Sequence, residues 1–120
     1  PEYAQEVADR WFKDWQPDGV HTEQLAWLLR DMDERGLGVQ GLQLPRTAWF
    51  EQAVAGSYSE QQAEYYERIG AAVEAAGGAE FTVVEPTAAG IALEHFRDAN
   101  HVNAQGAVIL SRYAAVRYWK

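Results

Sequence analysis

Hydrophobic residues recur every three or four positions in the first third of the chain, which predicts two amphipathic helices. The first covers residues 3–15 and ends at Pro17-Asp18-Gly19. Thr22 is a favourable N-cap for the second helix, which ends at Gly36 and Gly38. Their apolar positions are Ala4, Val7, Ala8, Trp11, Phe12 and Trp15 in the first helix, and Leu25, Leu28, Leu29 and Met32 in the second.

Two further helices are expected in the second half. Ser59 and Gln62 have the spacing of a capping box, and Gly77-Gly78 ends the helix that follows them. Asn103 is expected to cap the last helix. Residues 46–58 are ambiguous, with a short helix broken by Gly56 as one interpretation, and residues 87–101 indicate an irregular segment. The predicted inner positions are Tyr65 or Tyr66, Ile69, Ala72, Val73 and Ala76 in the third helix, and Ala107, Val108, Ser111, Ala114, Ala115 and Tyr118 in the last.

Two short runs predict strands, a buried one at residues 39–44 before Pro45 and a second one at residues 80–84 before Pro86. Strands that alternate with helices form parallel sheets, so we expect one α/β domain over residues 1–120. Its expected architecture is a small three-layer one, with a few-stranded parallel sheet flanked by helices. Two strands are few for a sheet, so either further strands escape detection or the chain is the C-terminal part of a larger sheet.

The charge balance limits the classes of partner. Lys and Arg number 10 against 18 Asp and Glu, which gives a net charge of −8. Such a chain is a poor partner for nucleic acid or for anionic membranes. No cysteine is present, which excludes disulfides, thiol catalysis and cysteine-based zinc sites. The apolar runs are shorter than the roughly 20 residues that a membrane-spanning helix needs. The chain starts at Pro1 without Met, which predicts a fragment or a processed product.

Asp98 and His101 are the principal candidates for chemistry. A histidine that an aspartate orients can act as a general base, because the carboxylate fixes the tautomer and stabilises the imidazolium. Both residues follow the second predicted strand and precede the last helix, which places them at the carboxyl edge of the sheet. The alternative interpretation is that they are ordinary loop and cap residues, since Asp-x-x-His is common by chance.

The wider pattern Phe-x-Asp-x-x-His-x-Asn-x-x-Gly-Ala, at residues 96–107, resembles the closing block of the SGNH (GDSL-type) hydrolase superfamily. The upstream order agrees in outline, with a helix at 25–36, a strand and proline at 39–45, a helix at 62–77 and a last strand at 80–85. The layout is most similar to the bacterial envelope branch of D-alanyl-transfer proteins and polysaccharide O-acetyltransferases. The resemblance implies the C-terminal part of a flavodoxin-like SGNH fold.

The resemblance also implies a chemistry. His101 would be the general base toward a serine, and Asp98 would orient His101. The reaction would transfer an acyl group from an ester to water or to an alcohol, such as a carbohydrate hydroxyl. Enzymes of this kind need no metal and no organic cofactor, and the branch is found in the cell envelope or outside the cell.

The nucleophile half of the site has no counterpart in these residues. The Gly-Asp-Ser block of the family is absent, as are its Gly and Asn oxyanion donors. The serines are Ser57, Ser59 and Ser111, of which Ser59 is expected to be a cap and Ser111 a helix-face residue. Without a nucleophile and oxyanion donors a site loses most of its transition-state stabilisation. We therefore expect the chain to be inactive alone, with the serine supplied by a missing N-terminal half or by a second copy.

Other residues suggest alternative functions. Glu94, His95, Asp98 and His101 could form a metal site, but their spacing matches no known ligand pattern, and His21 is expected to be a solvated turn residue. The five tryptophans indicate core packing or, alternatively, a contact surface or carbohydrate-binding groove, with Trp27 the best candidate for an exposed ring. Three roles are open for the apolar face of the first helix: packing inside this domain, packing where absent strands would otherwise lie, or self-association. A non-catalytic α/β interaction module is therefore the competing hypothesis.

Overall fold

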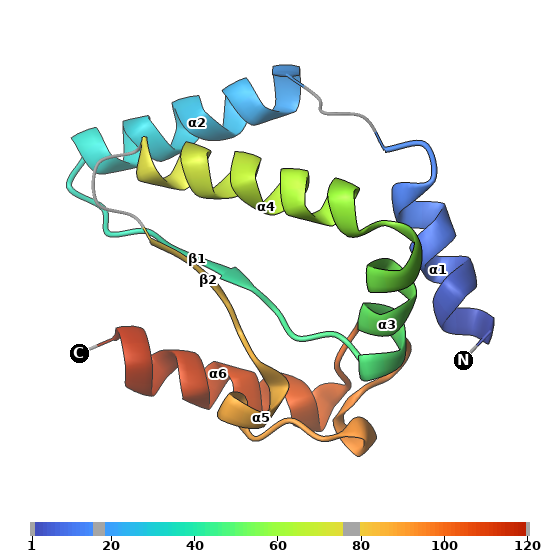
Figure 1. Ribbon diagram of the computed structural model, residues 1–120. Coiled ribbons are helices and arrows are strands. Elements are labelled where there is room, and N and C mark those ends of the chain that lie inside the picture. Colours follow the sequence, from blue (N-terminus) through green and yellow to red (C-terminus); the bar gives the residue numbers. More distant parts are fainter. Residues whose placement is uncertain (1, 16–18, 76–79, 120) are drawn as a thin grey trace.

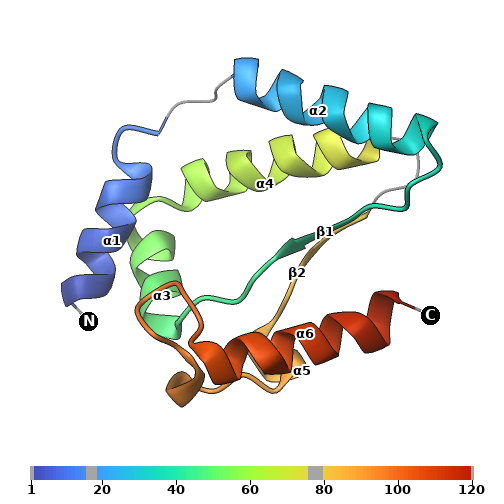
Figure 2. The ribbon, with the colours of Figure 1, turned by 180° about the vertical axis from the view of Figure 1, so that it is seen from behind.

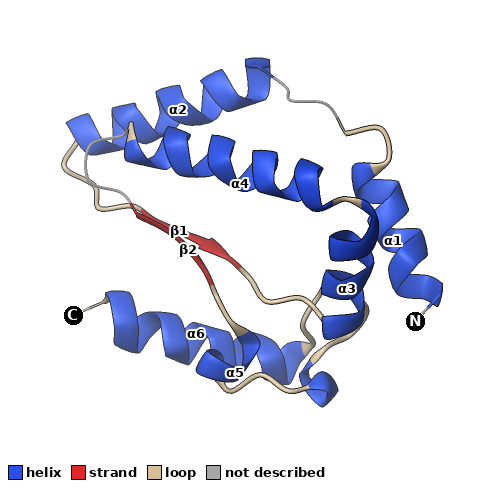
Figure 3. Cartoon of the chain, viewed as in Figure 1, coloured by secondary structure: helices blue, strands red, loops and turns tan. Residues whose placement is uncertain are grey.

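Helices surround a small sheet in the computed structural model, which describes residues 2–15, 19–75 and 80–119 (Figure 1, Figure 3). The chain begins with two helices and then alternates strands with helical segments, in the order that the sequence predicts. The elements are α1 Glu2–Phe12, α2 Gly19–Glu34, β1 Gln40–Gln43, α3 Ala48–Ser57, α4 Ser59–Glu74, β2 Glu80–Val83, α5 Pro86–Ala89, the 3-10 turn η1 Leu93–His95 and α6 Ala104–Tyr118.

The two strands are parallel, which confirms the predicted sheet. The register pairs Gln40 with Glu80 at one end and Gln43 with Val83 at the other. The N–H of Val84 donates to the carbonyl oxygen of Gln43 at 3.0 Å and extends the ladder by one residue. Among the described residues these two strands form the whole sheet, so the fold is mixed α/β with a small parallel sheet.

Helices lie on both faces of this sheet (Figure 1, Figure 2). On one face, Phe81 of β2 packs into a cluster around Leu29 of α2 and Val73 of α4. On the other, Leu42 of β1 packs against the cluster that contains Leu110 of α6. Phe81 and Leu42, which occupy adjacent positions in the register, therefore point to opposite faces of the sheet, as the pleat of a β-strand requires.

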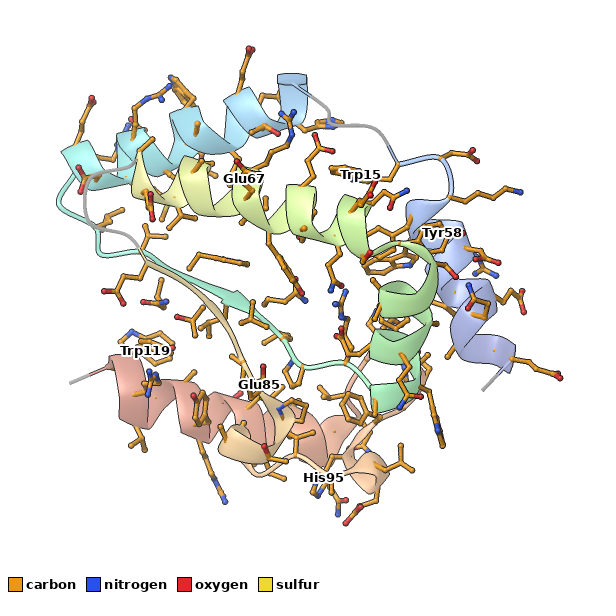
Figure 4. The ribbon with its side chains drawn as sticks, in the orientation of Figure 1. Trp15, Tyr58, Glu67, Glu85, His95 and Trp119 are labelled. Atoms are coloured by element: carbon orange, nitrogen blue, oxygen red, sulfur yellow. The ribbon has the colours of Figure 1, made fainter. Side chains whose placement is uncertain are left out.

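A third cluster joins α1 to α3 beyond the carboxyl end of β1. Phe50 and Val54 of α3 are fully buried, at 0% exposure, and Val7 and Phe12 of α1 pack against them. Tyr58 stacks on Phe12, with ring centroids 5.9 Å apart, and donates to Asp9 at 2.7 Å (Figure 4). The apolar face of α1 is thus used in internal packing against α3.

Two predicted helix starts are wrong. The helix α2 begins at Gly19, so Thr22 lies inside it rather than at its N-cap. The residues directly before Gly19, namely Pro17 and Asp18, lie outside the described residues. Ser59 is the first residue of α4, and Tyr58 takes the N-cap position without a side-chain hydrogen bond, so the capping box is not formed. The expected stop at Gly77-Gly78 also lies outside the described residues.

The ambiguous segment 46–58 contains a regular helix. Thr47 caps α3, because its hydroxyl oxygen accepts the N–H of Phe50 at 3.2 Å. Gly56 lies within the helix and does not break it. The segment 87–101 is less irregular than expected, since Pro86 follows β2 and opens the short helix α5.

The last helix has the predicted cap and a different inner face. Asn103 caps α6, its side-chain oxygen accepting the N–H of Gly106 at 3.0 Å. Gly106 and Leu110 are buried, whereas Val108 is 50% exposed. A Cβ at position 106 would collide with the carbonyl oxygen of His95, so only glycine lets this side of α6 face inward. Of the predicted inner residues, Ala107, Val108 and Ser111 are exposed, and Ala114, Ala115 and Tyr118 are half-buried.

The tryptophans are mostly outside the core, so the expectation of core packing is wrong for them. Trp15 is half-buried, with its ring 6.5 Å from that of Tyr65. The exposed rings are Trp11 at 51%, Trp27 at 63%, Trp49 at 45% and Trp119 at 80%. The prediction that Trp27 is exposed is confirmed. None of the described helices combines the length and the apolar character needed to cross a bilayer.

Candidate functional site

The Asp98 and His101 side chains contact each other in a narrow loop between η1 and α6. Phe96 and Val102 form an isolated antiparallel bridge at the base of this loop. Above it, the N–H of Arg97 donates to the carbonyl oxygen of His101 at 2.8 Å. The chain therefore reverses direction within a few residues, which brings Asp98 and His101 to the same side of the turn.

The carboxylate of Asp98 is the acceptor around which the loop is built. Its Oδ1 accepts the backbone N–H of Asn100 at 3.1 Å and that of His101 at 2.9 Å. This is the local side-chain-to-backbone pattern that aspartate forms in tight turns. The same oxygen lies 2.9 Å from Nδ1 of the His101 ring, and Oδ2 lies 3.1 Å from it. Backbone hydrogen bonds thus fix the position of the carboxylate that orients the imidazole.

The geometry fixes the tautomer of His101. An ionised carboxylate only accepts hydrogen bonds, so Nδ1 carries the proton and Nε2 keeps a free lone pair when the ring is neutral. The side chain of His101 is 52% exposed and that of Asp98 is 26% exposed. The ring is therefore held on one side by a partly buried carboxylate and is exposed to solvent on the other.

The pKa of Asp98 favours this arrangement. Partial burial alone raises the pKa of the carboxyl, but the hydrogen bonds from Asn100 and His101 lower it by more. The net effect holds the pKa of Asp98 below the ordinary value of an aspartate. The carboxylate is therefore ionised at neutral pH and able to stabilise a positive charge on His101.

A buried threonine fixes the loop to the scaffold. The hydroxyl of Thr47 donates to the carbonyl oxygen of Ala99 at 2.6 Å, and the N–H of Thr47 donates to the same oxygen at 3.0 Å. Thr47 is 3% exposed and also caps α3 through Phe50. The connection that follows β1 therefore determines where the Asp98 loop lies. This places Asp98 and His101 at the carboxyl side of the sheet, where α/β folds hold their ligand-binding residues.

A second attachment lies on the other side of the loop. The side-chain N–H of Asn103 donates to the carbonyl oxygen of Glu94 at 2.7 Å, and its backbone N–H donates to that of His95 at 2.8 Å. The N-cap of α6 is therefore bonded to η1 as well as to its own helix. The side chain of Asn100 differs from that of Asn103, because its Nδ2 is buried without a hydrogen-bond partner within the described part of the chain.

The other histidines do not join the pair. His95 turns toward its own 3-10 turn, and its Nδ1 accepts the N–H of Ala92 at 2.9 Å (Figure 4). His21 is exposed on α2. Within the described residues, no three histidine or acidic side chains converge in a geometry that could hold a metal ion. The set of Glu94, His95, Asp98 and His101 is therefore not a preformed metal site in this part of the chain.

The serines lie away from His101. Ser57 is the last residue of α3 and its hydroxyl accepts from Gln5 at 3.4 Å. Ser59 opens α4, and Ser111 donates to the carbonyl oxygen of Ala107 on its own helix at 2.8 Å. No serine of the described residues hydrogen-bonds the His101 ring, so the Asp98–His101 pair has no serine partner within this part of the chain.

A buried arginine next to Thr47 was not singled out by the sequence pattern. Arg46 is 6% exposed, and its guanidinium donates to Glu51 at 2.6 and 3.1 Å, to Gln62 at 2.6 Å and to Tyr66 at 3.1 Å. It also lies over the ring of Phe50, 4.8 Å from the centroid. The cluster joins the start of α3 to α4, and burial raises the pKa of the Tyr66 hydroxyl. Its role is to hold the scaffold that carries Thr47.

Comparisons of this chain with family models, with curated proteins and with solved structures each return no match. The resemblance to SGNH hydrolases therefore rests on the residues of the chain, and its functional meaning is a proposal.

Proposed function

We propose that this chain supplies the base half of an acyl-transfer site of the SGNH type. The observation that carries the proposal is the 2.9 Å contact between Nδ1 of His101 and Oδ1 of Asp98, in a pair whose imidazole is 52% exposed. Such a pair suits proton transfer to and from an oxygen nucleophile. The proposed fold is the C-terminal part of a flavodoxin-like SGNH domain, in which β1 and β2 are the last two strands.

The mechanism uses His101 twice. Its Nε2 takes the proton of a serine hydroxyl while the serine oxygen attacks the carbonyl carbon of an ester, and the imidazolium then gives that proton to the leaving alcohol. In the second half, His101 takes a proton from water or from an acceptor alcohol that attacks the acyl-serine. The serine oxygen leaves and recovers the proton from His101. Asp98 stays ionised throughout and stabilises the imidazolium.

The serine comes from outside the described residues. A segment that carries the nucleophile and the oxyanion donors would lie beside the carboxyl side of the sheet, where Asp98 and His101 are held. The proposed source is the N-terminal part of the same parent protein, with a second copy of the chain as the alternative. Because no step requires a metal or an organic cofactor, the complete site would consist of amino-acid side chains and backbone groups alone.

Hydrolysis of an unactivated acetyl ester tests the proposal. The parent protein, with its native upstream residues, should hydrolyse the ester, and the His101→Ala variant should lose at least about 100-fold of this rate. His21→Ala, which removes an exposed histidine from α2, is the matched control and should keep the activity. A parent protein that is folded and inactive, or one whose activity survives His101→Ala, would refute the proposal.

A non-catalytic interaction module is the second candidate. The observation that favours it is the exposure of Trp27 at 63% and of Leu28 at 47% on α2. Trp119 cannot extend this surface, because it follows α6 on the opposite side of the sheet from α2 (Figure 1, Figure 4). A module of this kind would bind protein or carbohydrate through the exposed apolar residues of α2. Loss of such binding in Trp27→Ala, together with an inactive parent protein, would support it over the catalytic proposal.

A further inference from the structure

A crevice opens between the carboxyl ends of the two strands. After β1 the chain continues to α4, on the face of the sheet that α2 covers, and after β2 it continues to α6 on the other face (Figure 1, Figure 3). Neighbouring strands whose connections diverge in this way leave the crevice in which parallel α/β sheets bind small ligands. The crevice has a volume of about 260 Å³. Its walls are residues 43–46, residues 83–86, Glu51 of α3, and Gln62 and Tyr66 of α4.

The buried Arg46 has one nitrogen that is not used inside the protein. Its Nε and Nη2 donate every hydrogen bond that the guanidinium makes to the described residues, and Nη1 makes none of them. Within the described residues, the one enclosed side-chain nitrogen or oxygen without a partner is Nδ2 of Asn100. Nη1 is therefore not enclosed, although Arg46 is only 6% exposed. Because Arg46 lines the crevice, Nη1 can donate to a molecule held there.

Two neighbours of Arg46 keep donors as well. The side-chain oxygen of Gln62 accepts from Arg46, which leaves its amide NH₂ group without a partner among the described residues. The hydroxyl oxygen of Tyr66 also accepts from Arg46, so its own proton remains to be donated. Burial raises the pKa of this hydroxyl, which keeps it protonated at neutral pH. The Arg46 side of the crevice is therefore rich in donors, as binding of a carboxylate requires.

Glu85 gives the same crevice a separate negative charge. Arg46 pairs with Glu51 rather than with Glu85, although both glutamates line the crevice. Glu85 is exposed and takes the N-cap position of α5, where its side chain makes no capping bond. Two carboxylates against one guanidinium repel a simple anion, and a simple cation would leave the donors around Arg46 unused. A ligand with one charge of each sign uses both groups.

We propose that the crevice binds a free aliphatic α-amino acid, with its carboxylate on Nη1 of Arg46 and the hydroxyl of Tyr66, and its ammonium group on the carboxylate of Glu85. This ligand is distinct from the ester of the proposed function, because its carboxylate is free. The site is also separate from the Asp98–His101 pair, since neither residue lines the crevice.

The size and the uncharged walls of the crevice select the side chain of the ligand. A volume of 260 Å³ equals about eight or nine water molecules at roughly 30 Å³ each, which accommodates an amino acid of the size of leucine and excludes a longer peptide. The apolar walls include Leu44, which is 50% exposed, and Val83, which is 42% exposed. An aliphatic side chain would cover both of them.

Calorimetric titration of the chain with L-leucine and two matched analogues tests the proposal. The analogue 4-methylpentanoate lacks only the ammonium group, and 3-methylbutylamine lacks only the carboxylate. Leucine should bind saturably and at least about tenfold more tightly than either analogue, because each analogue loses a hydrogen bond between charged groups. No saturable binding of leucine, or equal binding by either analogue, would overturn the proposal.

Two variants test the two ends of the site separately. Glu85→Gln should weaken leucine at least about tenfold and should not weaken 4-methylpentanoate, whereas Tyr66→Phe should weaken both and leave the amine unchanged. Glu67→Gln, at an exposed glutamate of α4 outside the crevice, is the matched control and should bind leucine as wild type does (Figure 4). A folded Glu85→Gln variant that binds leucine with wild-type affinity would overturn the assignment of the ammonium group.

His101→Ala separates this inference from the proposed function. The variant should bind leucine as wild type does, because His101 is not part of the crevice. Leucine binding by a chain whose parent protein hydrolyses no ester would support the crevice and refute the catalytic proposal. Ester hydrolysis that depends on His101, without leucine binding, would refute the crevice and leave the proposed function in place.

Discussion

The hydroxyl of Thr47 donates to the carbonyl oxygen of Ala99 at 2.6 Å, across 52 residues of sequence. This bond joins the end of the connection after β1 to the loop that carries Asp98 and His101. Because Thr47 is also the N-cap of α3, one buried side chain links a strand, a helix and the candidate site. The position of the pair therefore depends on a residue that takes no part in the proposed chemistry.

Thr47→Val should destabilise the protein and loosen the loop. The valine side chain has nearly the same shape but neither donates to Ala99 nor accepts from Phe50, while the backbone N–H of residue 47 keeps its own bond to Ala99, so we expect a loss of about 2 kcal/mol in the free energy of unfolding. Urea unfolding measures this loss, and NMR of the His101 ring reports on the loop. Thr47→Ser keeps the hydroxyl and should stay within about 1 kcal/mol of wild type. A Val variant as stable as wild type would show that the bond does not hold the loop.

Gly106→Ala should be strongly destabilising for a glycine substitution in a helix. The added Cβ would collide with the carbonyl oxygen of His95 and lie 2.8 Å from Cβ of Val102. Because the first contact is to backbone, α6 or η1 must move, and we expect a cost of about 2–3 kcal/mol in thermal or urea unfolding.

Gly70→Ala is the matched control for this prediction. An added Cβ at position 70 meets no atom within 4 Å, and the residue lies inside α4. Alanine should therefore stabilise the protein by about 0.5–1 kcal/mol through its helix propensity. Equal effects of the two substitutions would mean that the fit of α6 against η1 is looser than the structure indicates.

The local features of the fold could be predicted from the sequence. Apolar runs that end at Pro45 and Pro86 mark the strands, and the Asn103 cap follows from residue type and position. The contact between Asp98 and His101 was expected from local spacing too, because residues three positions apart in a tight turn have their side chains on the same side of the turn. Each of these features is encoded within about one turn of chain.

The features that were missed depend on distant contacts. Apolar spacing alone predicts the wrong inner face for α6. Gly106 packs closely against the carbonyl oxygen of His95, and this contact determines that the side of α6 with Leu110 faces inward. Thr47 was not singled out by the sequence pattern, because its partner Ala99 lies far along the chain. Arg46 likewise gains its meaning from Glu51, Gln62 and Tyr66, which the fold brings together.

Asp98 should make stability depend on pH in a defined direction. Its pKa lies below the ordinary value in the folded protein, so its contribution to stability is complete above the unfolded pKa of about 3.9. The contribution is lost as the pH falls below that value and through the folded pKa. Asp98→Asn should therefore cost about 1 kcal/mol at pH 7 and little at the acid end of this window.

The comparison of wild type with Asp98→Asn across pH isolates this effect, because the other carboxyl groups titrate in both proteins. Urea unfolding between pH 2.5 and pH 7 measures the difference. A difference that stays constant down to the lowest pH would show that the lost hydrogen bonds, rather than the charge of Asp98, account for the change. A difference that grows toward low pH would contradict the direction of the pKa shift.

Arg46→Met should reveal how far the scaffold depends on its buried cation. The substitution leaves Glu51, Gln62 and Tyr66 without their shared donor, which for a buried pair costs about 3–5 kcal/mol. Glu51 is 42% exposed and can turn toward water, so we expect a smaller loss of about 2 kcal/mol in the free energy of unfolding. Arg46→Lys should restore little of it, because one ammonium cannot reproduce the planar fork that faces three partners.

Arg68→Met provides the reference for an ordinary ion pair. Arg68 pairs with Glu64 along α4, and both side chains are about two-fifths exposed, at 41% and 43%. Such pairs contribute about 0.5 kcal/mol or less, so this variant should unfold close to wild type. If Arg46→Met were no more destabilising than Arg68→Met, the cluster would not hold α3 against α4, and Thr47 would have to be positioned by the α1–α3 core alone.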